Sequence, residues 1–358
     1  MGYSEVGSEF WENPEFCIKK KEKTGVIHQS ESFFCGRTAL DCIIRDAKHE
    51  IGLKSVLLPS YCCHTMIEPF VRNNIKIRFY SVTVTEKGFH REIPEPQSKE
   101  AFYIMPYFGF EGIEVYKKGQ LARWDFCILD ETHSCFREDV IQCVDWNVKY
   151  RFASYRKWAN IRGYASAVKN NGNFRFLCDK SVKREYVELI MQACSIKMGY
   201  MKTNQGNKED FLRLYEEAEE LLESDYIGYQ ACEQGILSYQ MLDKNQMRTK
   251  RRENANYLLE KLRGKENIII PFSKIEEKDC PLFFPIFLKD SCRNGLKQYL
   301  IKQNIYCPIH WPIASYHKLM GKEERVYRQE LSLVCDQRYG ISDMSKIADT
   351  ILDYLKSR

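Results

Sequence analysis

Short apolar runs recur along the first two thirds of the chain, and stretches with helical spacing separate them. The runs SVLLPSYCC, IKIRFYSV, AFYIMPYFG and FCILDETH are each long enough for one strand. Between such runs, residues 35–52 repeat apolar side chains every three or four positions, at Leu40, Ile43, Ile44, Ala47 and Ile51. Continuous apolar strands that alternate with helices are typical of a parallel sheet with helices on both faces. The pattern therefore predicts an α/β fold with a doubly wound, mostly parallel sheet.

The pattern changes after residue 207, where helices that are charged on one side dominate. They are predicted in KEDFLRLYEEAEELLES and in the region from Tyr229 to Arg263. A strand in DCPLFFPIFL, helices in NGLKQYLIKQ and ISDMSKIADTILDYLKS, and the segment NIYCPIHWP complete the chain. We expect an N-terminal arm at residues 1–30, a large α/β domain at 31–245 and a smaller α+β domain at 246–358.

Composition and charge narrow the class of protein. Of the 358 residues, 44% are hydrophobic, and 54 basic residues against 49 acidic ones leave a formal charge of only +5. No basic block indicates nucleic-acid binding, and no stretch approaches the roughly 18 apolar residues of a membrane span or resembles a signal peptide. The fifteen cysteines are scattered without a C-x-x-C pair, so neither a metal site nor a disulfide framework is expected. We expect a cytosolic protein.

Three chemically distinct features fall where the predicted strands end. Asp130 ends the strand FCILD, Lys157 follows the strand RFASY, and Gly36 to Thr38 open a predicted helix. Ligands of open parallel sheets bind at the carboxyl ends of the strands, and a helix N-terminus binds anions through its free N–H groups. An anion cradle, a carboxylate and a lysine are what pyridoxal phosphate (PLP) requires. Alternatively, Lys157 is a solvated surface lysine and Asp130 caps a helix.

The order of several motifs resembles a known family. ILDETHS is followed by the lysine of ASYRK, with GRTAL and LPSYCCHTMIEPF upstream, and with RTKRRENANYLLEKL, NIYCPIHWPI and LSLVCDQRYGISDMSKI downstream. The series resembles the DegT/DnrJ/EryC1/StrS sugar aminotransferases, which have the type I fold of aspartate aminotransferase. The resemblance implies a PLP enzyme that moves an amino group from an amino acid, with glutamate as the expected donor, to a keto group of a nucleotide-linked sugar, as in polysaccharide biosynthesis. It also implies a homodimer with each active site at the interface.

The resemblance assigns roles to individual residues. Lys157 is the Schiff-base lysine, Asp130 pairs with the pyridinium nitrogen, and His133 is the hydrogen-bond partner of the cofactor's phenolic oxygen. Further cofactor contacts are implied for Gly36, Arg37, Thr38, Ala39, Cys63 and Ser154. His310 and Arg156 are the residues expected at the substrate.

Two departures from the family pattern leave alternatives open. Cys63 stands where an aromatic side chain usually stacks on the cofactor ring, and Tyr61 or His64 would have to replace it. The glycine-rich stretch after the lysine is reduced to Gly163. Another PLP-dependent reaction on an amino acid, such as a lyase or racemase reaction, or a catalytically silent homologue therefore remains an alternative.

Overall fold

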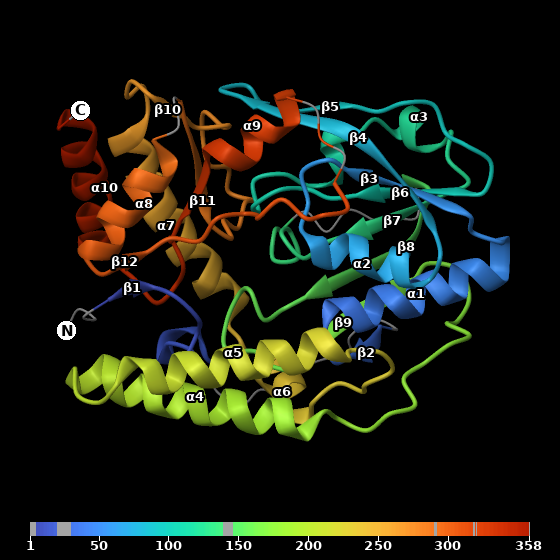
Figure 1. The fold of residues 1–358 in the computed structure, drawn as a ribbon, viewed down its shortest axis with the longest axis horizontal. Coiled ribbons are helices and arrows are strands. Elements are labelled where there is room, and N and C mark those ends of the chain that lie inside the picture. Colours follow the sequence, from blue (N-terminus) through green and yellow to red (C-terminus); the bar gives the residue numbers. More distant parts are fainter. Residues whose placement is uncertain are drawn as a thin grey trace.

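The computed structural model describes residues 5–19, 30–138, 146–289, 292–317, 319 and 321–357. A large sheet with helices packed on it occupies one side of the molecule, and a small sheet with the C-terminal helices occupies the other (Figure 1). Two long antiparallel helices, α4 and α5, run along one edge of both parts.

The large sheet has eight strands in the order β2-β9-β8-β7-β6-β3-β4-β5. Their bounds are β2 (Glu31–Phe33), β3 (Ser55–Pro59), β4 (Lys76–Thr85), β5 (Gly88–Glu92), β6 (Glu100–Ile104), β7 (Phe126–Asp130), β8 (Val148–Ser154) and β9 (Ala165–Lys169). The five adjacent strands from β8 to β4 are parallel, whereas β2, β9 and β5 join by antiparallel pairing at the two sides. Every residue of β3, β6 and β7 is buried, as continuous apolar strands require. The predicted mostly parallel sheet is confirmed.

Helices and loops cover both faces of this sheet. Helices α1 (Gly36–Ile51) and α2 (His64–Arg72) pack on one face, where Phe70 of α2 contacts Tyr103 of β6. The adjacent Phe102 points to the other face and stacks on Trp124 at 4.9 Å. Trp124 belongs to the crossover that contains the 3₁₀ helix η2 (Ile113–Val115) and α3 (Lys118–Leu121). The sheet is therefore doubly wound, as predicted.

The second part of the molecule is built on a three-stranded antiparallel sheet in the order β10-β11-β13. Its strands are β10 (Ile268–Ile269), β11 (Phe284–Leu288) and β13 (Glu330–Leu333). The remaining elements are β1 (Val6–Gly7), η1 (Glu15–Cys17), α4 (Arg184–Thr203), α5 (Lys208–Ser224), α6 (Glu233–Met241), α7 (Lys244–Leu262), α8 (Arg293–Lys302), β12 (Ile305–Tyr306), α9 (Gly321–Gln329) and α10 (Ile341–Lys356). Val6 and Trp11 pack into the same core as α7, α8 and α10, because β1 pairs with β12.

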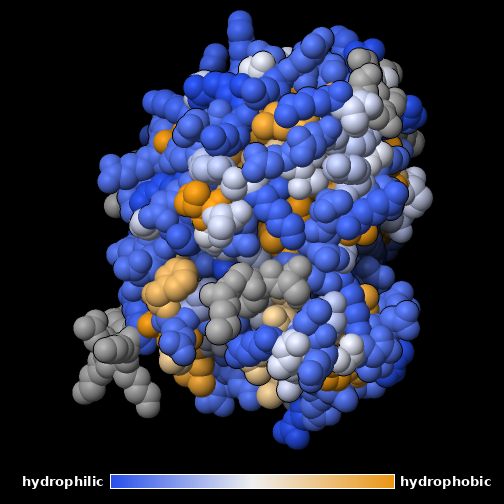
Figure 2. Space-filling model, turned by 90° about the vertical axis from the view of Figure 1, so that its left-hand side faces the viewer, coloured by the Kyte–Doolittle hydropathy of each residue, from blue (hydrophilic) through white to orange (hydrophobic). Residues whose placement is uncertain are grey.

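The division of the chain at residue 245 remains a prediction, and it falls at the start of α7. Of the predicted N-terminal arm, residues 1–4 and 20–29 lie outside the described residues. No helix in the described ranges is long and apolar enough to cross a membrane. On the side of the molecule shown in Figure 2, apolar residues are scattered among hydrophilic ones where grey atoms do not cover the surface.

Candidate functional site

A small cavity of about 60 Å³ lies where β7 and β8 end and where α1 and α2 begin. Seven of the predicted site residues line it: Gly36, Arg37, Cys63, Asp130, Ser154, Arg156 and Lys157. They come from four separate elements or the turns next to them. The fold thus brings together residues that are far apart in sequence, at the carboxyl ends of strands, where ligands of such sheets bind.

Asp130 is held at the cavity wall by two hydrogen bonds. The Tyr103 hydroxyl donates to Oδ2 at 2.7 Å, and the Thr132 backbone N–H donates to Oδ1 at 2.9 Å. Burial raises the pKa of Asp130 above its ordinary value, while the bonds from Thr132 and Tyr103 and the charge of Lys157 pull the pKa down. Asp130 is 2% exposed, so a cationic partner in the cavity would favour the ionised form of its carboxyl group.

Lys157 follows β8 and is half-buried. Within the described part of the chain, its ammonium group has no hydrogen-bond or ion-pair partner. It lines the small cavity and also a larger neighbouring cavity of about 580 Å³. A lysine side chain without such a partner can reach a molecule in either cavity, and its amine reacts once it is deprotonated.

The N-terminus of α1 forms another wall of the small cavity. The N–H groups of Gly36, Arg37 and Thr38 precede the first intrahelical bond, and Cys35 offers no side-chain cap. A β-carbon on Gly36 would lie 3.1 Å from Cβ of Ser154, so glycine lets the helix approach this strand. These backbone donors suit an anion.

The side chains of Thr38 and Ala39 do not line the cavity, unlike the other residues predicted for the phosphate turn. The Thr38 hydroxyl donates to the Tyr226 carbonyl at 2.6 Å, and the Ala39 N–H donates to the Cys35 carbonyl at 3.1 Å. The Thr38 hydroxyl is thus used within the protein, and only the backbone N–H of Thr38 remains as a donor. The Ala39 N–H is used within the helix, and its predicted cofactor contact stays a prediction.

His133 is buried beside the site without lining the small cavity. Its Nδ1 accepts the Phe108 N–H at 3.4 Å, which assigns the ring proton to Nε2, and Nε2 has no acceptor among the described residues. The ring packs against Trp311, with centroids 5.6 Å apart. Burial, followed by the charges of Lys157 and His310, lowers the pKa of His133, so the ring is neutral. A buried donor without an acceptor is costly unless a ligand satisfies it.

Cys63 lines the cavity, and neither proposed aromatic substitute does. Its sulfur lies 2.7 Å from the Thr65 hydroxyl. Tyr61 is fully buried and packs against Trp311, with centroids 5.1 Å apart. His64 is exposed and lies 3.7 Å from Glu223. The aromatic residue expected above the cofactor ring therefore has no replacement at either position.

The two predicted substrate residues line the larger cavity, together with cations from other elements. Arg156 forms an ion pair with Glu219, and His310 is 6% exposed. Burial and then the charge of Lys157 lower the pKa of His310. The cavity is also lined by Lys208 of α5 and Lys297 of α8. Glu9 and Asp336 line it as well, but basic residues outnumber these acidic ones, and the excess suits a molecule that carries negative charge.

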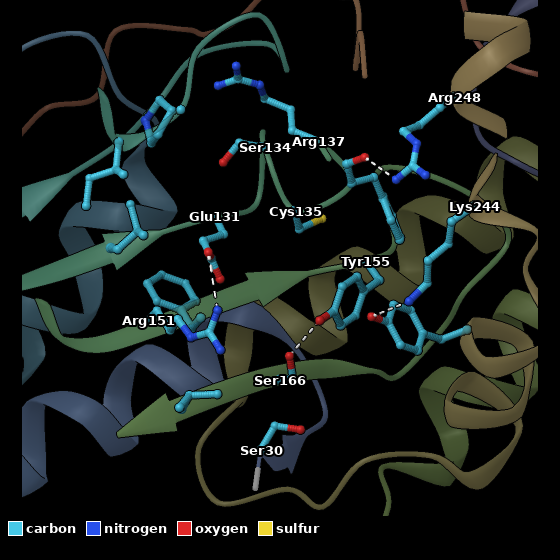
Figure 3. Close-up of a pocket in the computed structure, with 18 residues that line it drawn as sticks. Ser30, Glu131, Ser134, Cys135, Arg137, Arg151, Tyr155, Ser166, Lys244 and Arg248 are labelled. Carbon is cyan, nitrogen blue, oxygen red and sulfur yellow. Dashed lines mark hydrogen bonds and ion pairs between the residues drawn. The ribbon is translucent and has the colours of Figure 1, made fainter. Parts of the chain in front are cut away.

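A third cavity, of about 280 Å³, lies on the opposite face of the large sheet (Figure 3). Arg151 of β8 faces it, whereas the neighbouring Tyr150 bonds to Asp46 of α1 on the other face. Many of its polar side chains pair with each other: Glu131 lies 3.7 Å from Arg151, and Tyr155 is 2.6 Å from Ser166 (Figure 3). It contains none of the predicted site residues, so we assign it no part in the site.

Several residues of the site were not predicted from the sequence. They are Tyr103 and Thr132 beside Asp130, Glu219 beside Arg156, and Glu330 and Ser332 beside His310. Thr132 lies in the motif ILDETHS and Ser332 in LSLVCDQRYGISDMSKI, but the resemblance gave neither residue a role. Tyr103, Glu219 and Glu330 lie outside the quoted motifs. For Tyr103, the period-two alternation of β6 indicates that its side chain is on the same face as α2.

The comparisons with known proteins concern the fold. No family model matches the sequence, and no curated protein matches it. Among solved structures, PseC of Helicobacter pylori, an aminotransferase of pseudoaminic acid biosynthesis, aligns with a TM-score of 0.64 at 13% identity, over 92% of this chain and 87% of PseC. NtdA of Bacillus subtilis, solved with bound PMP, gives 0.61 at 12% identity, over 91% and 73%.

The sugar aminotransferase CalS13 of Micromonospora echinospora gives a TM-score of 0.58 at 13% identity, over 90% of this chain and 87% of CalS13. Identities this low establish a shared architecture and leave the reaction to be argued from the site. The chain has the fold of these aminotransferases, the type I fold expected from the sequence.

Proposed function

We propose that this protein is a PLP-dependent aminotransferase that transfers an amino group from an amino acid, with glutamate as the expected donor, to a keto group of a nucleotide-linked sugar. The observation that carries the proposal is the arrangement of Lys157, Asp130 and the N-terminus of α1 around one cavity. The neighbours by fold support it, because NtdA was solved with PMP and CalS13 is described as a sugar aminotransferase.

The residues of the cavity fit the cofactor at both ends. Phosphate would be held by the free N–H groups at the start of α1 and by the Ser154 hydroxyl. Asp130, fixed by Tyr103, would face the ring nitrogen. The unsatisfied Nε2–H of His133 would donate to the phenolic oxygen. A buried N–H group without an acceptor is expected where a ligand oxygen normally accepts its hydrogen bond.

When bound, the cofactor supplies an electron sink for the charge left on the substrate carbon after proton loss. The protein's own groups do the remaining work. Lys157 would hold the cofactor covalently, and its free amine would move the proton between the substrate carbon and the adjoining carbon of the cofactor. Asp130 would favour a protonated ring nitrogen, because a facing cation stabilises a buried carboxylate.

The substrate assignment rests on the larger cavity. A volume of about 580 Å³ and a lining that includes Lys208 and Lys297 suit a bulky anionic molecule such as a nucleotide-linked sugar. His310 lies in the same cavity, within electrostatic range of Lys157. The competing proposal, a lyase or racemase on an amino acid, is favoured by the lack of an aromatic residue at Cys63 and by the reduced glycine content after Lys157, where only Gly163 remains of the expected stretch. Conversion of bound PLP to PMP by glutamate separates the two.

We also propose a cytosolic homodimer. A cofactor cavity at the edge of an α/β domain needs a second wall to exclude water, and a partner subunit would supply it. Sedimentation velocity at micromolar concentration tests this assembly: full activity in a pure monomer would contradict it.

Covalent labelling tests the cofactor assignment. Purified protein saturated with PLP and reduced with borohydride should carry a phosphopyridoxyl group on Lys157, located by peptide mapping. Lys157→Ala should lose the label, while the matched control Lys302→Ala, an exposed lysine of α8, should keep it. A label on another lysine, or none at saturation, would overturn the proposal.

A further inference from the structure

A chain of three polar side chains lies behind the cavity that His310 lines. The Ser332 hydroxyl lies 2.8 Å from Nδ1 of His310 and 2.5 Å from Oε1 of Glu330. The backbone N–H of His310 donates to the other carboxyl oxygen of Glu330, also at 2.5 Å. Ser332 and Glu330 are 0% exposed and His310 is 6% exposed. The chain therefore runs through the interior and reaches the cavity at the histidine.

The position of the His310 ring is fixed on several sides. Its centroid lies 4.9 Å from that of Phe283 and 5.6 Å from that of Phe108. Since Nδ1 is used by Ser332, Nε2 is the nitrogen left for a molecule in the cavity, and it has no partner within the described ranges. Burial keeps the ring neutral by lowering its pKa. What varies is then which of the two nitrogens carries the single proton.

We propose that Glu330, acting through Ser332, sets the tautomer of His310 and thereby decides whether His310 donates or accepts a proton in the substrate cavity. The inference rests on the proposed function, in which this cavity receives the keto substrate. Glu330 and Ser332 are positioning residues, because they reach the substrate only through the histidine. The geometry supports the coupling, since Ser332 has one proton and contacts both Nδ1 of His310 and Oε1 of Glu330.

Two hydrogen-bond directions are available along the chain. When Glu330 carries a proton, it donates to Ser332, Ser332 donates to Nδ1 of His310, and the ring proton stays on Nε2. When Glu330 is ionised, Ser332 donates to Glu330, Nδ1–H donates to Ser332, and Nε2 presents a lone pair. His310 is an acid toward the cavity in the first state and a base in the second.

Transfer of one proton to the substrate converts the first state into the second, and the number of protons is conserved. The Nε2 proton moves to a substrate oxygen, the Ser332 proton moves to Nδ1, and the Glu330 proton moves to the serine oxygen. The substrate gains one proton and Glu330 loses one, while His310 and Ser332 stay neutral. No charge is created on the ring, which is buried where an imidazolium would be costly.

The surroundings of Glu330 let it hold or release a proton near neutral pH. Burial raises the pKa of Glu330 to about 8, against the lowering effects of Ser332, the His310 N–H and two cations of α8, Arg293 and Lys297. Among the described residues no lysine or arginine forms an ion pair with its carboxyl group. Among the described residues, Tyr61 and Cys307 also interact with it electrostatically, and Nδ1 of His310 lies 3.9 Å from Oε1.

The test observes the ring nitrogens of His310 directly, by ¹⁵N–¹H NMR of the full chain labelled at histidine, with and without added PLP. Seven histidines are present, and His310→Gln assigns the resonance. We expect the proton to move from Nε2 to Nδ1 as pH rises, with a midpoint near 8. Glu330→Gln should hold one tautomer from about pH 6 to 10. An unchanged midpoint in that variant, or a single tautomer in the native protein, would overturn the relay.

The serine offers a second pair of variants should Glu330→Gln fold poorly. Ser332→Ala should uncouple the histidine from Glu330, and Ser332→Thr, which keeps the hydroxyl, should restore the transition. His317 takes no part in the hydrogen bonds between His310, Ser332 and Glu330. Its Nε2 lies 3.1 Å from the Tyr327 hydroxyl, so its resonances serve as an internal reference. A Ser332→Ala variant with a normal transition at His310 would contradict the proposal.

Kinetics separate a failure of the relay from a failure of the proposed function. The single-turnover rate of amination should show a pH limb near 8 that is absent in Glu330→Gln, with a rate loss on the order of tenfold to a hundredfold. Normal turnover with a pH-independent tautomer overturns the relay alone. No turnover with any donor or keto sugar, beside the expected NMR transition, overturns the proposed function and leaves the coupling established.

Discussion

Replacing Asp130 with asparagine should separate the electrostatic role of this carboxylate from its structural role. Asparagine has the same shape, and its oxygen can accept the Thr132 N–H while its amide faces the Tyr103 oxygen. Both hydrogen bonds of the native side chain thus have a counterpart in Asp130→Asn. We expect the fold and PLP binding to be retained, because the phosphate contacts lie elsewhere.

The stability of the protein without cofactor should not suffer. Burial raises the folded-state pKa of Asp130 above its value in the unfolded chain, which is near 3.9. The folded state therefore binds this proton more tightly, and the resulting stabilisation is full below that value and lost as pH rises through the folded pKa. Asparagine carries no such proton. The melting temperature of Asp130→Asn at pH 7 should equal or exceed that of the native protein, with a shallower pH dependence above about pH 4.

The rate with cofactor bound should fall steeply. Losing a preorganised charge opposite developing charge costs about 3 kcal/mol, roughly a factor of 150 in rate. Stopped-flow absorbance of the PLP form mixed with glutamate, at saturating cofactor, measures it. The control Tyr103→Phe keeps the carboxylate and loses one hydrogen bond, so its rate should fall only on the order of tenfold. Native turnover in Asp130→Asn, or a large loss of stability at pH 7, would refute the assignment.

Three further substitutions test single contacts. Thr38→Ala should lower the free energy of unfolding by about 1 kcal/mol in urea titrations, because its hydroxyl donates to Tyr226, with PLP affinity nearly unchanged. Ser154→Ala removes a hydroxyl at the cavity and should lower the affinity for PLP several-fold in a fluorescence titration. Equal effects of Thr38→Ala and Ser154→Ala on PLP affinity would contradict the structural role of the Thr38 hydroxyl and the phosphate contact of the Ser154 hydroxyl. Burial lowers the pKa of Lys197 to about 7, so between that pH and about pH 10 the unfolded chain binds more protons and stability rises with pH. Lys197→Met should flatten this rise in thermal melts, and an unchanged slope would exclude Lys197 as its origin.

The large sheet and the central pair of the site could be predicted because both depend on local features. Continuous apolar runs identify buried strands, and the strand-end rule then places Asp130 and Lys157 at one edge. Helix α4 was not predicted from the sequence, because the apolar pattern on which helix prediction depends is absent there. Its sequence REYVELIMQACSIKMGYMKT has apolar residues around the helix, including Met191, which is 53% exposed. It therefore lacks the one-sided pattern that the prediction depended on.

The partners of the central residues could not be predicted, because long-range packing supplies them. Tyr103 is one of 22 tyrosines, and only its register on β6 brings its hydroxyl to Asp130. Glu330 and Ser332 are two positions apart on β13, so both face the same side of that strand, toward His310. The resemblance also predicted that Thr38 binds phosphate without distinguishing its backbone from its side chain. In the structure the Thr38 hydroxyl donates to the Tyr226 carbonyl, and only its backbone N–H is left for a ligand.

The unpaired charge of Lys157 links the two histidines of the site. Its ammonium group lowers the pKa of His133 and of His310, in both cases after the larger effect of burial. Both rings are therefore neutral while Lys157 is free, and a neutral ring can donate from one nitrogen while accepting at the other. Burial, as the larger effect, favours the neutral form of both rings, and the charge of Lys157 acts in the same direction. A neutral relay through Ser332 therefore moves a proton without building charge beside Lys157.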